Sequence, residues 1–329
     1  MVTIEQLDLP GSRPILGREC RFAARGEPLA AVEYFLEHEG VFYPHPLRGE
    51  PDGSIRLYPE APGRYALHAA WRSSQGQSGW TQAEFHVKGA HGSAPQRVTA
   101  EGETLWVPTA RDAEILGAHE RPVFRELQKI IRPGATVYDV GANVGLFSAR
   151  FARWIGAGGW LYAIEPNPLC VYFLRANLEH AGTGNFTILP VALSNRGGDC
   201  SFRINYGSSL LGVGGDSTVA GKPGHEIHVE GRSLDTLIAA FNLRTPDFIK
   251  LDVEGAEASA VEGMMATLEK SRPDFMIELH GREAGSQTLR RLAGLGYEYL
   301  VPSTATRYPT AEAVLDSMPE ACVQVIGYA

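Results

Sequence analysis

Two segments in the second half of the chain carry residue types suited to proton transfer. Lys250, Asp252 and Glu254 alternate along one segment, and Glu278 and His280 alternate along another. Alternate residues of a strand share a face, so each set points to one side if these segments are strands. If the two strands are neighbours, the acids and His280 converge into a cluster whose pKa values we expect to be perturbed.

Three interpretations of this cluster stay open. His280 or Asp252 can act as a general base, or the acids and His280 can hold a divalent cation that lowers the pKa of a hydroxyl. The third is a structural network that closes the end of the sheet, with Lys250 neutralising an acid. Glu257 opens a helix, where an acid is favourable in any case, so we interpret it as a capping acid. We assign the four-residue cluster to catalysis and no residue to a metal.

A glycine-containing turn, VYDVGANVG at 137–145, closes an apolar segment and opens a helical pattern. Gly141 permits a tight turn and Gly145 a close approach to the backbone. The free N–H groups of a helix start attract an anion. The turn lacks the G-x-G-x-x-G spacing of dinucleotide-binding sites. This absence favours an amino-acid-like ligand, whose ammonium group can donate a hydrogen bond to Asp139. Glu165 ends the next strand, where an acid can accept both hydroxyls of a ribose.

The elements around these residues alternate between strand and helix from about residue 123 onward. This alternation predicts a mostly parallel sheet covered on both faces, with ligands at the carboxyl ends of its strands. The predicted strands are 136–140, 159–164, 186–193, 248–253, 275–279, 297–301 and 322–327. The predicted helices are 123–131, 146–154, 169–180, one that ends at 268, and 288–295.

A glycine-rich insertion, 194–232, interrupts this alternation. A long insertion of this kind inside an α/β domain is more often functional than idle. We predict a hairpin and a mobile flap over the site.

The amino-terminal part has a different pattern. Short alternating runs and a polar glycine-containing turn predict a hairpin over 65–87. We predict a small all-β, immunoglobulin-like sandwich at 1–95, a linker at 88–96 and a second domain at 96–329. Trp80, in or beside a turn, is the candidate to stack on a sugar.

Composition excludes several classes of protein. The chain has 329 residues, 44% hydrophobic, and a formal charge of −8 from 30 basic and 38 acidic residues. That balance disfavours a nucleic-acid partner or an anionic membrane surface. We expect no membrane span and no secretory signal. Four scattered cysteines suggest neither a zinc site nor a disulfide framework, which fits reduced thiols in a cytoplasm.

At this point five motifs together resemble the FkbM branch of S-adenosylmethionine-dependent methyltransferases. They are DVGANVG at 139–145, AIEPNP at 163–168, ILPVALSN at 188–195, FIKLDVEGAE at 248–257 and MIELH at 276–280. The resemblance implies a class I methyltransferase fold, which is a Rossmann-like doubly wound α/β sheet. It also implies S-adenosylmethionine as methyl donor and an oxygen nucleophile as acceptor.

The resemblance also implies roles for residues around the cofactor. Asp139, Gly141, Asn143 and Gly145 would hold the methionine end. Glu165 would hold the ribose, with Asn167 nearby. Val191, Ala192 and Leu193 would lie against the adenine, with Ser194 as a polar neighbour.

The sequence therefore predicts an O-methyltransferase that acts on a hydroxyl of a sugar, glycan, glycolipid, macrolide or related natural product. Residues 1–95 would serve substrate binding or dimerisation. The alternative is a non-catalytic carbohydrate-binding or scaffold protein with a degenerate Rossmann-like domain. A nicotinamide oxidoreductase is disfavoured by the missing G-x-G-x-x-G, and nucleic-acid methylation by the charge. The acceptor, metal dependence and homo-oligomer formation stay open.

Overall fold

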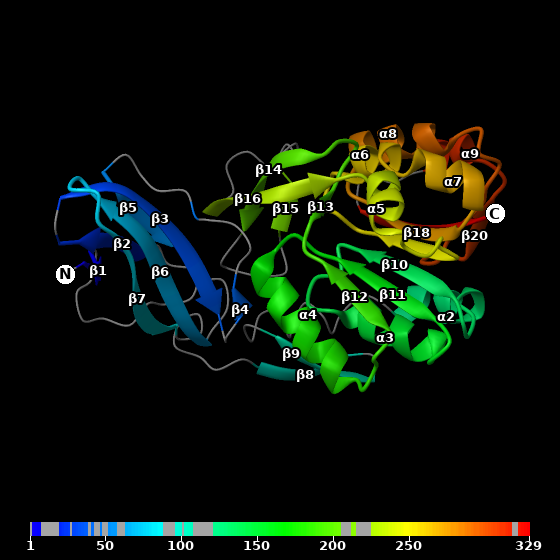
Figure 1. Cartoon of the computed structure of the whole chain (residues 1–329). Helices are drawn as coiled ribbons and strands as arrows, with labels where there is room; N and C mark the ends of the chain where they lie inside the picture. The colour runs from blue at the N-terminus through cyan, green and yellow to red at the C-terminus, as the bar shows by residue number, and fades with distance from the viewer. Residues whose placement is uncertain are drawn as a thin grey trace. The chain divides into compact units, whose positions relative to one another are not determined.

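A computed structural model gives the structure of the chain. It describes residues 2–7, 20–26, 28–38, 41–42, 47, 52–57, 63–87, 96–100, 102–107, 121–204, 212–214, 225–317 and 322–329. Two compact units divide the chain, residues 1–95 and 96–329 (Figure 1). Residues 88–95 of the predicted linker lie outside the described residues.

An eight-stranded sheet forms the centre of the second unit, in the order β12-β11-β10-β17-β18-β21-β19-β20. Strands β12 to β18 of this order run parallel, and β21 inserts antiparallel between β18 and β19. Figure 1 shows β10, β11 and β12 as adjacent arrows. The bounds are Thr136–Val140 (β10), Trp160–Ile164 (β11), Phe186–Leu189 (β12), Phe248–Leu251 (β17), Asp274–Leu279 (β18), Glu298–Val301 (β19), Thr306–Tyr308 (β20) and Val323–Tyr328 (β21).

Helices cover both faces of this sheet because its strands are apolar on both sides. Val137 joins one core with α2, α3 and α4, and Tyr138 joins the other with α5 to α9. Within the described ranges, we find no helix long and apolar enough to cross a bilayer. The bounds are Arg121–Ile130 (α2), Leu146–Ile155 (α3), Pro168–His180 (α4), Leu234–Phe241 (α5), Glu257–Glu262 (α6), Met265–Ser271 (α7), Arg282–Leu292 (α8) and Ala311–Ser317 (α9).

The predicted strand 186–193 is wrong in one respect, because it divides between two sheets. Val191 N donates to Leu189 O at 2.9 Å, which closes a tight turn around Pro190. Proline has no backbone N–H and therefore cannot continue the hydrogen bonding of the strand. After this turn the chain enters a second sheet of order β13-β16-β14-β15. The bounds are Ala192–Leu193 (β13), Gly198–Ile204 (β14), Gly212–Gly214 (β15) and His225–Arg232 (β16).

The insertion 194–232 contains the predicted hairpin, since β14 and β16 pair antiparallel. Residues 205–211 and 215–224 of the predicted flap lie outside the described residues. The helix predicted to end at 268 is two helices, α6 and α7, which meet at Gly263. A Cβ on Gly263 would lie 2.1 Å from Ser194 O, so this junction packs directly on the turn after β13.

An unpredicted hairpin of β8 (Gln96–Ala100) and β9 (Glu103–Val107) opens the second unit. The buried Asn177 of α4 accepts from Trp106 N at 2.7 Å and donates to Trp106 O and Val144 O. Glu103 forms ion pairs with Arg150 and Arg153 of α3. These contacts hold the hairpin against the helices that follow the glycine turn.

The first unit is built from two antiparallel sheets, β1-β2-β5 and β4-β3-β6-β7. Both contribute to one core, in which Phe22 and Ile55 of the first sheet join Leu67 and Ala69 of the second. The predicted hairpin over 65–87 is confirmed as β6 and β7, whereas an immunoglobulin-like relationship stays a prediction. The bounds are Thr3–Gln6 (β1), Cys20–Arg25 (β2), Leu29–His38 (β3), Val41–Phe42 (β4), Ser54–Leu57 (β5), Gly63–Ser73 (β6) and Ser78–Val87 (β7).

Candidate active site

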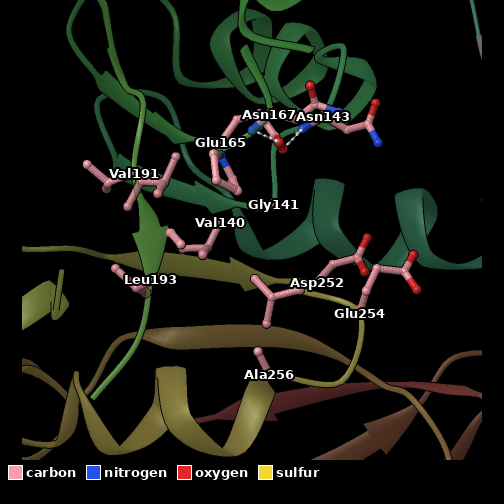
Figure 2. A pocket seen from close by; sticks show the side chains of 14 residues that line it. Val140, Gly141, Asn143, Glu165, Asn167, Val191, Leu193, Asp252, Glu254 and Ala256 are labelled. Carbon is pink, nitrogen blue, oxygen red and sulfur yellow. Dashed lines mark hydrogen bonds between the residues drawn. The ribbon is translucent and has the colours of Figure 1, made fainter. Parts of the chain in front are cut away.

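A cavity opens where β10, β11 and β17 end, which is where parallel sheets bind ligands (Figure 2). Its walls come from four loops of the second unit. The lining residues are Val140, Gly141, Asn143, Ile164, Glu165, Pro166, Asn167, Val191, Ala192, Leu193, Asp252, Val253, Glu254 and Ala256. The cavity therefore has an apolar side from the turn around Pro190 and two separate acidic positions.

Glu165 holds the first acidic position and ties two of the loops together. Its carboxylate accepts from Asn143 N and from Asn167 N, each at 2.8 Å. Burial raises the pKa of Glu165 to about 7, against the opposing effect of these two hydrogen bonds. Each carboxylate oxygen keeps a further lone pair, so Glu165 can also accept from two hydroxyls of a ligand.

Gly141 shapes the floor of the cavity. It has φ +72°, and a Cβ there would lie 1.7 Å from Asp252 O. Only glycine fits a turn that both adopts this conformation and crosses so close to the loop after β17. Gly145 serves a different purpose, since its Cβ would meet Leu174 of α4 at 2.8 Å.

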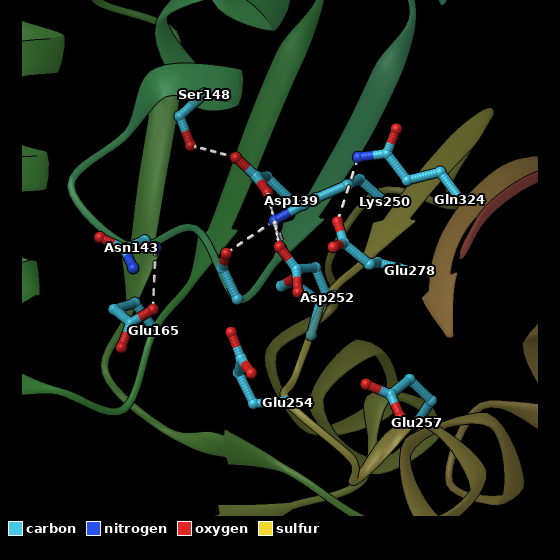
Figure 3. Close-up of polar contacts among 12 residues, drawn as sticks. Asp139, Asn143, Ser148, Glu165, Lys250, Asp252, Glu254, Glu257, Glu278 and Gln324 are labelled. Carbon is cyan, nitrogen blue, oxygen red and sulfur yellow. Dashed lines mark hydrogen bonds and ion pairs between the residues drawn. The ribbon is translucent and has the colours of Figure 1, made fainter. Parts of the chain in front are cut away.

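Lys250 lies buried beneath the glycine turn, with 2% of its surface exposed. Its Nζ donates to Gly141 O at 2.7 Å and lies 3.3 Å from Asp139 Oδ1 and 3.4 Å from Asp252 Oδ2 (Figure 3). Burial acts to lower the pKa of Lys250, but the charges of Asp139 and Asp252 outweigh it and raise the pKa. Lys250 therefore stays an ammonium and connects the turn to both carboxylates.

Asp139 is fully buried and takes no part in the cavity surface. Its Oδ2 accepts from Ser148 Oγ at 2.6 Å, and its Oδ1 faces Lys250. The sequence predicts that Asp139 binds the ammonium group of a ligand. In the structure, the ammonium group of Lys250 already occupies the position beside Asp139.

The second acidic position belongs to a cluster around His280, at the ends of β17 and β18. His280 Nδ1 donates to Glu257 Oε1 at 2.8 Å. Its Nε2 lies 3.5 Å from Glu254, 3.8 Å from Asp252 and 3.9 Å from Glu278. The predicted convergence of these residues is thus observed, and Glu257, which we interpreted as a capping acid, also orients the imidazole.

His280 is held in its protonated form by this surrounding. Burial acts to lower the pKa of His280, but the hydrogen bonds with Cys322 and Glu257 and the charge of Glu254 outweigh it. They raise the pKa to about 12. An imidazole that keeps its proton at neutral pH cannot take another, which argues against His280 as the general base.

Glu254 is the acid best placed to accept a proton. It lines the cavity, and its backbone has φ +53°, a conformation that non-glycine residues seldom adopt. Burial is the largest cause that raises the pKa of Glu254 to about 7, and the charge of Asp252 adds to it. A carboxyl with a pKa near the working pH is well suited to general base catalysis.

The other two acids of the cluster are engaged elsewhere. Asp252 lines the cavity but forms the ion pair with Lys250. Glu278 accepts from Cys322 Sγ at 3.0 Å and from Gln324 Nε2 at 3.1 Å, both on the neighbouring segment that leads into and forms β21. These contacts of Glu278 fit the third interpretation of the cluster, a structural network that closes the end of the sheet.

Two overlapping groups of this cluster have ligand atoms close enough to hold a metal ion. They are Asp252 with Glu254 and His280, and Glu278 with His280 and Cys322. Oxygen, nitrogen and sulfur ligands together would suit a borderline cation better than magnesium. We assign neither group a metal.

The structure places seven of the predicted cofactor residues in the lining of the cavity and three outside it. Asp139 lies below the turn, Gly145 packs on α4, and Ser194 Oγ donates to Arg196 O within its own turn. The seven in the lining are Gly141, Asn143, Glu165, Asn167, Val191, Ala192 and Leu193.

Sequence reasoning missed three partners. Ser148 contacts Asp139, Glu257 contacts His280, and Cys322 contacts Glu278. The contact between Ser148 and Asp139 could have been predicted from the sequence. Ser148 lies two positions after the first residue of α3, where a side chain faces the preceding strand. Cys322 carries no such signal, since the register of β18 and β21 places it.

The strand order, with one antiparallel strand inserted between β18 and β19, is that of a class I methyltransferase. Residues 139–299 match the family model of the methyltransferase FkbM domain. This part of the second unit is therefore similar to the FkbM methyltransferase family.

Three characterised methyltransferases are similar to this domain. Hexuronic acid methyltransferase AglP of Haloferax volcanii is 28% identical over 167 residues, covering 49% of this chain and 62% of that protein. 2-O-methyltransferase NoeI of Sinorhizobium fredii is 26% identical, covering 46% and 66%. 31-O-demethyl-FK506 methyltransferase FkbM of Streptomyces tacrolimicus is 30% identical, covering 41% and 61%. The chain spans less than two thirds of the length of each relative.

Among solved structures, a methyltransferase FkbM from Methylobacillus flagellatus is similar with a TM-score of 0.36 and 16% identity. The match covers 63% of this chain and 50% of that one.

The methyl donor of such a domain is S-adenosylmethionine, and the cavity residues fit it. The carboxylate of Glu165 is buried in the lining of the cavity, and Gly141 lets the turn pass close to the loop after β17. The apolar wall of Val191 and Leu193 suits a flat aromatic base.

Proposed function

We propose that the protein is an S-adenosylmethionine-dependent O-methyltransferase that acts on a hydroxyl of a sugar, glycan or related natural product. The observation that carries this proposal is the pair of acidic positions in one cavity. Both line the cavity, where Glu165 would bind the donor and Glu254 would activate an acceptor. The names of the relatives, which specify hexuronic acid, a 2-O position and a 31-O position, support the same acceptor class.

The donor side of the cavity would bind through Glu165, whose carboxylate accepts the two ribose hydroxyls while Asn143 N and Asn167 N hold it in place. When bound, S-adenosylmethionine supplies an electrophilic methyl group on a sulfonium. Val191 and Leu193 would exclude water from the base, and Gly141 would let the methionine end follow the turn.

The acceptor side would work through Glu254. Its carboxylate takes the proton of the acceptor hydroxyl as the new oxygen–carbon bond forms and the carbon–sulfur bond breaks. The His280 imidazolium, oriented by Glu257, keeps Glu254 and Asp252 in position from 3.5 and 3.8 Å. Asp252 is engaged by Lys250 at 3.4 Å, whereas Glu254, whose pKa is raised to about 7, is suited to exchange a proton at neutral pH.

We infer a cytoplasmic site of action for this reaction. The four cysteines are scattered along the sequence without a CxxC spacing or a disulfide framework, which fits a reducing compartment.

Calorimetric titration with S-adenosylmethionine and S-adenosylhomocysteine, with NAD as a control ligand, tests the donor site. We expect micromolar binding of the first two, weakened at least about tenfold in Glu165→Ala, because two hydrogen bonds to a charged group are lost. Glu269→Ala, which removes an exposed carboxylate of α7, is the matched control.

Transfer of a labelled methyl group to a panel of sugars and glycans then tests the reaction. Binding of NAD alone would contradict the donor assignment. Tight donor binding without transfer to any hydroxyl acceptor would instead favour the non-catalytic carbohydrate-binding alternative.

A further inference from the structure

The four-stranded sheet of the first unit carries an aromatic pair on the face turned away from its core, the exposed Trp80 and the partly buried Phe35. Trp80 of β7 is 67% exposed, the largest value among the exposed large hydrophobic residues of the described chain. The ring of Phe35, on β3, lies 5.6 Å from that of Trp80 between centroids, at an angle of 37°.

The register of the sheet explains how these rings meet. Phe35 pairs with His68 of β6, and Trp80 pairs with Ala70 two residues further along the same strand. The small side chain of Ala70 leaves space for the two rings to contact each other diagonally across β6. The face is fixed by three paired strands, so the rings form a rigid surface.

Polar side chains surround this pair on the same face. His68 Nε2 lies 2.9 Å from Glu37 Oε2, and Gln82 follows His68 in the same row across the sheet. Alternation places three glutamates, two arginines and two histidines on this face, so acidic and basic groups are mixed and its net charge is small. They are Glu33, Glu37 and Glu84, Arg64 and Arg72, and His68 and His86.

This composition is unlike the centre of a protein–protein interface, which is depleted in charged residues. Two aromatic rings within a ring of carboxylate, amide and imidazole groups instead match a sugar. The apolar C–H face of a pyranose can lie on an aromatic ring while its hydroxyls donate to carboxylate and amide oxygens. Balanced charge favours an uncharged chain over a polyanion.

We propose that this aromatic platform, formed by Phe35 and Trp80 with His68, Glu37 and Gln82, binds a neutral carbohydrate chain. The proposal goes beyond methyl transfer, because the lining of the donor cavity comes from the second unit. A glycan held on the first unit would raise the local concentration of hydroxyl acceptors for the same molecule.

The test uses the full-length protein without S-adenosylmethionine, so that its result does not depend on the proposed reaction. Affinity electrophoresis through gels that contain dextran, mannan or xylan measures retardation, with polygalacturonate as the anionic comparison. We expect one or more neutral polymers to retard the protein. Trp80→Ala and Phe35→Ala should each weaken that binding about tenfold or more.

Phe241→Ala is the matched control, because Phe241 is a 62% exposed aromatic residue of α5 in the second unit. Circular dichroism melts of each variant check that the sheet is intact, and Trp80→Phe should restore part of the binding. Failure of all three neutral polymers to bind, or equal binding by Trp80→Ala, would overturn the proposal. A Trp80-dependent change of mass in light scattering, without polymer binding, would assign the face to a second copy.

Discussion

Glu254 is the residue on which the proposed chemistry depends most directly. Glu254→Gln keeps the shape of the side chain but cannot take a proton, so we expect kcat to fall about 10²- to 10⁴-fold. The dissociation constant of S-adenosylmethionine should stay within about twofold, since Glu165 lies on the other side of the cavity. Single-turnover kinetics and calorimetry measure the two quantities separately.

The raised pKa of Glu254 also predicts how kcat depends on pH. The base must be ionised to act, and the pKa of Glu254 is raised to about 7, so kcat should fall as the pH drops below about 7. Glu278→Gln is the matched control, because Glu278 is engaged by Cys322 and Gln324 and should keep the acid limb of the profile. If the pH profile of kcat were unchanged in Glu254→Gln, the general base would have to be another residue.

At this scale the sequence predicts which residues gather but not what each one does. Glu165 and Asn143 follow from a local motif, and their contact spans 22 residues. The protonation of His280 depends on Glu257 and on Cys322, which lies 42 positions away and enters through β21. Such a contact has no signature in the sequence, because it arises from strand register and burial.

The turn between β10 and α3 requires glycine at position 141. Gly141→Ala would force a Cβ into Asp252 O and a side-chain residue into φ +72°. We expect a loss of at least ~2 kcal/mol in the free energy of unfolding and weaker donor binding, because the turn must move. Chemical denaturation and calorimetry measure both effects.

Gly134→Ala separates the clash from the backbone conformation. Gly134 has φ +87°, but a Cβ there meets nothing within 4 Å. Its substitution should therefore cost about 1–2 kcal/mol and leave donor binding unchanged. If the two variants behaved alike, the close approach of the turn to β17 would not matter for the site.

At the scale of elements, the strands that build the site are the ones that the sequence predicts well. The run 136–140 is mostly apolar and β-branched because helices cover both faces of the sheet, and 248–251 is buried along its whole length. The prediction fails at 186–193, where Pro190 turns the chain into another sheet, and it omits α5 and the β8–β9 hairpin. The hairpin depends on Asn177, which lies 71 residues from Trp106, so local periodicity gives no sign of it.

At the scale of the whole molecule, the change of period near residue 96 predicts a division that coincides with the two compact units. Because the cavity is lined by residues between Val140 and Ala256, a chain of residues 96–329 should bind S-adenosylmethionine within about threefold of the full chain. The same truncation should lose binding to neutral polysaccharides. Calorimetry and affinity electrophoresis on the two chains test this separation.

A chain that ends at residue 95 gives the reciprocal comparison. Retained polysaccharide binding there, with no donor binding, would support two independent sites. Loss of donor binding from a folded 96–329 chain would show that the first unit supports the cavity.

The position of β21 has a consequence for how the protein is made. Residues 323–328 are synthesised after every other strand of the central sheet, yet they lie between β18 and β19. While the ribosome still holds this segment, β18 and β19 each present an unpaired edge, and Glu278 lacks its Gln324 partner. Closure of the sheet therefore has to wait until residues 323–328 have emerged from the ribosome, and translation that stalls shortly before residue 323 would produce an aggregation-prone intermediate.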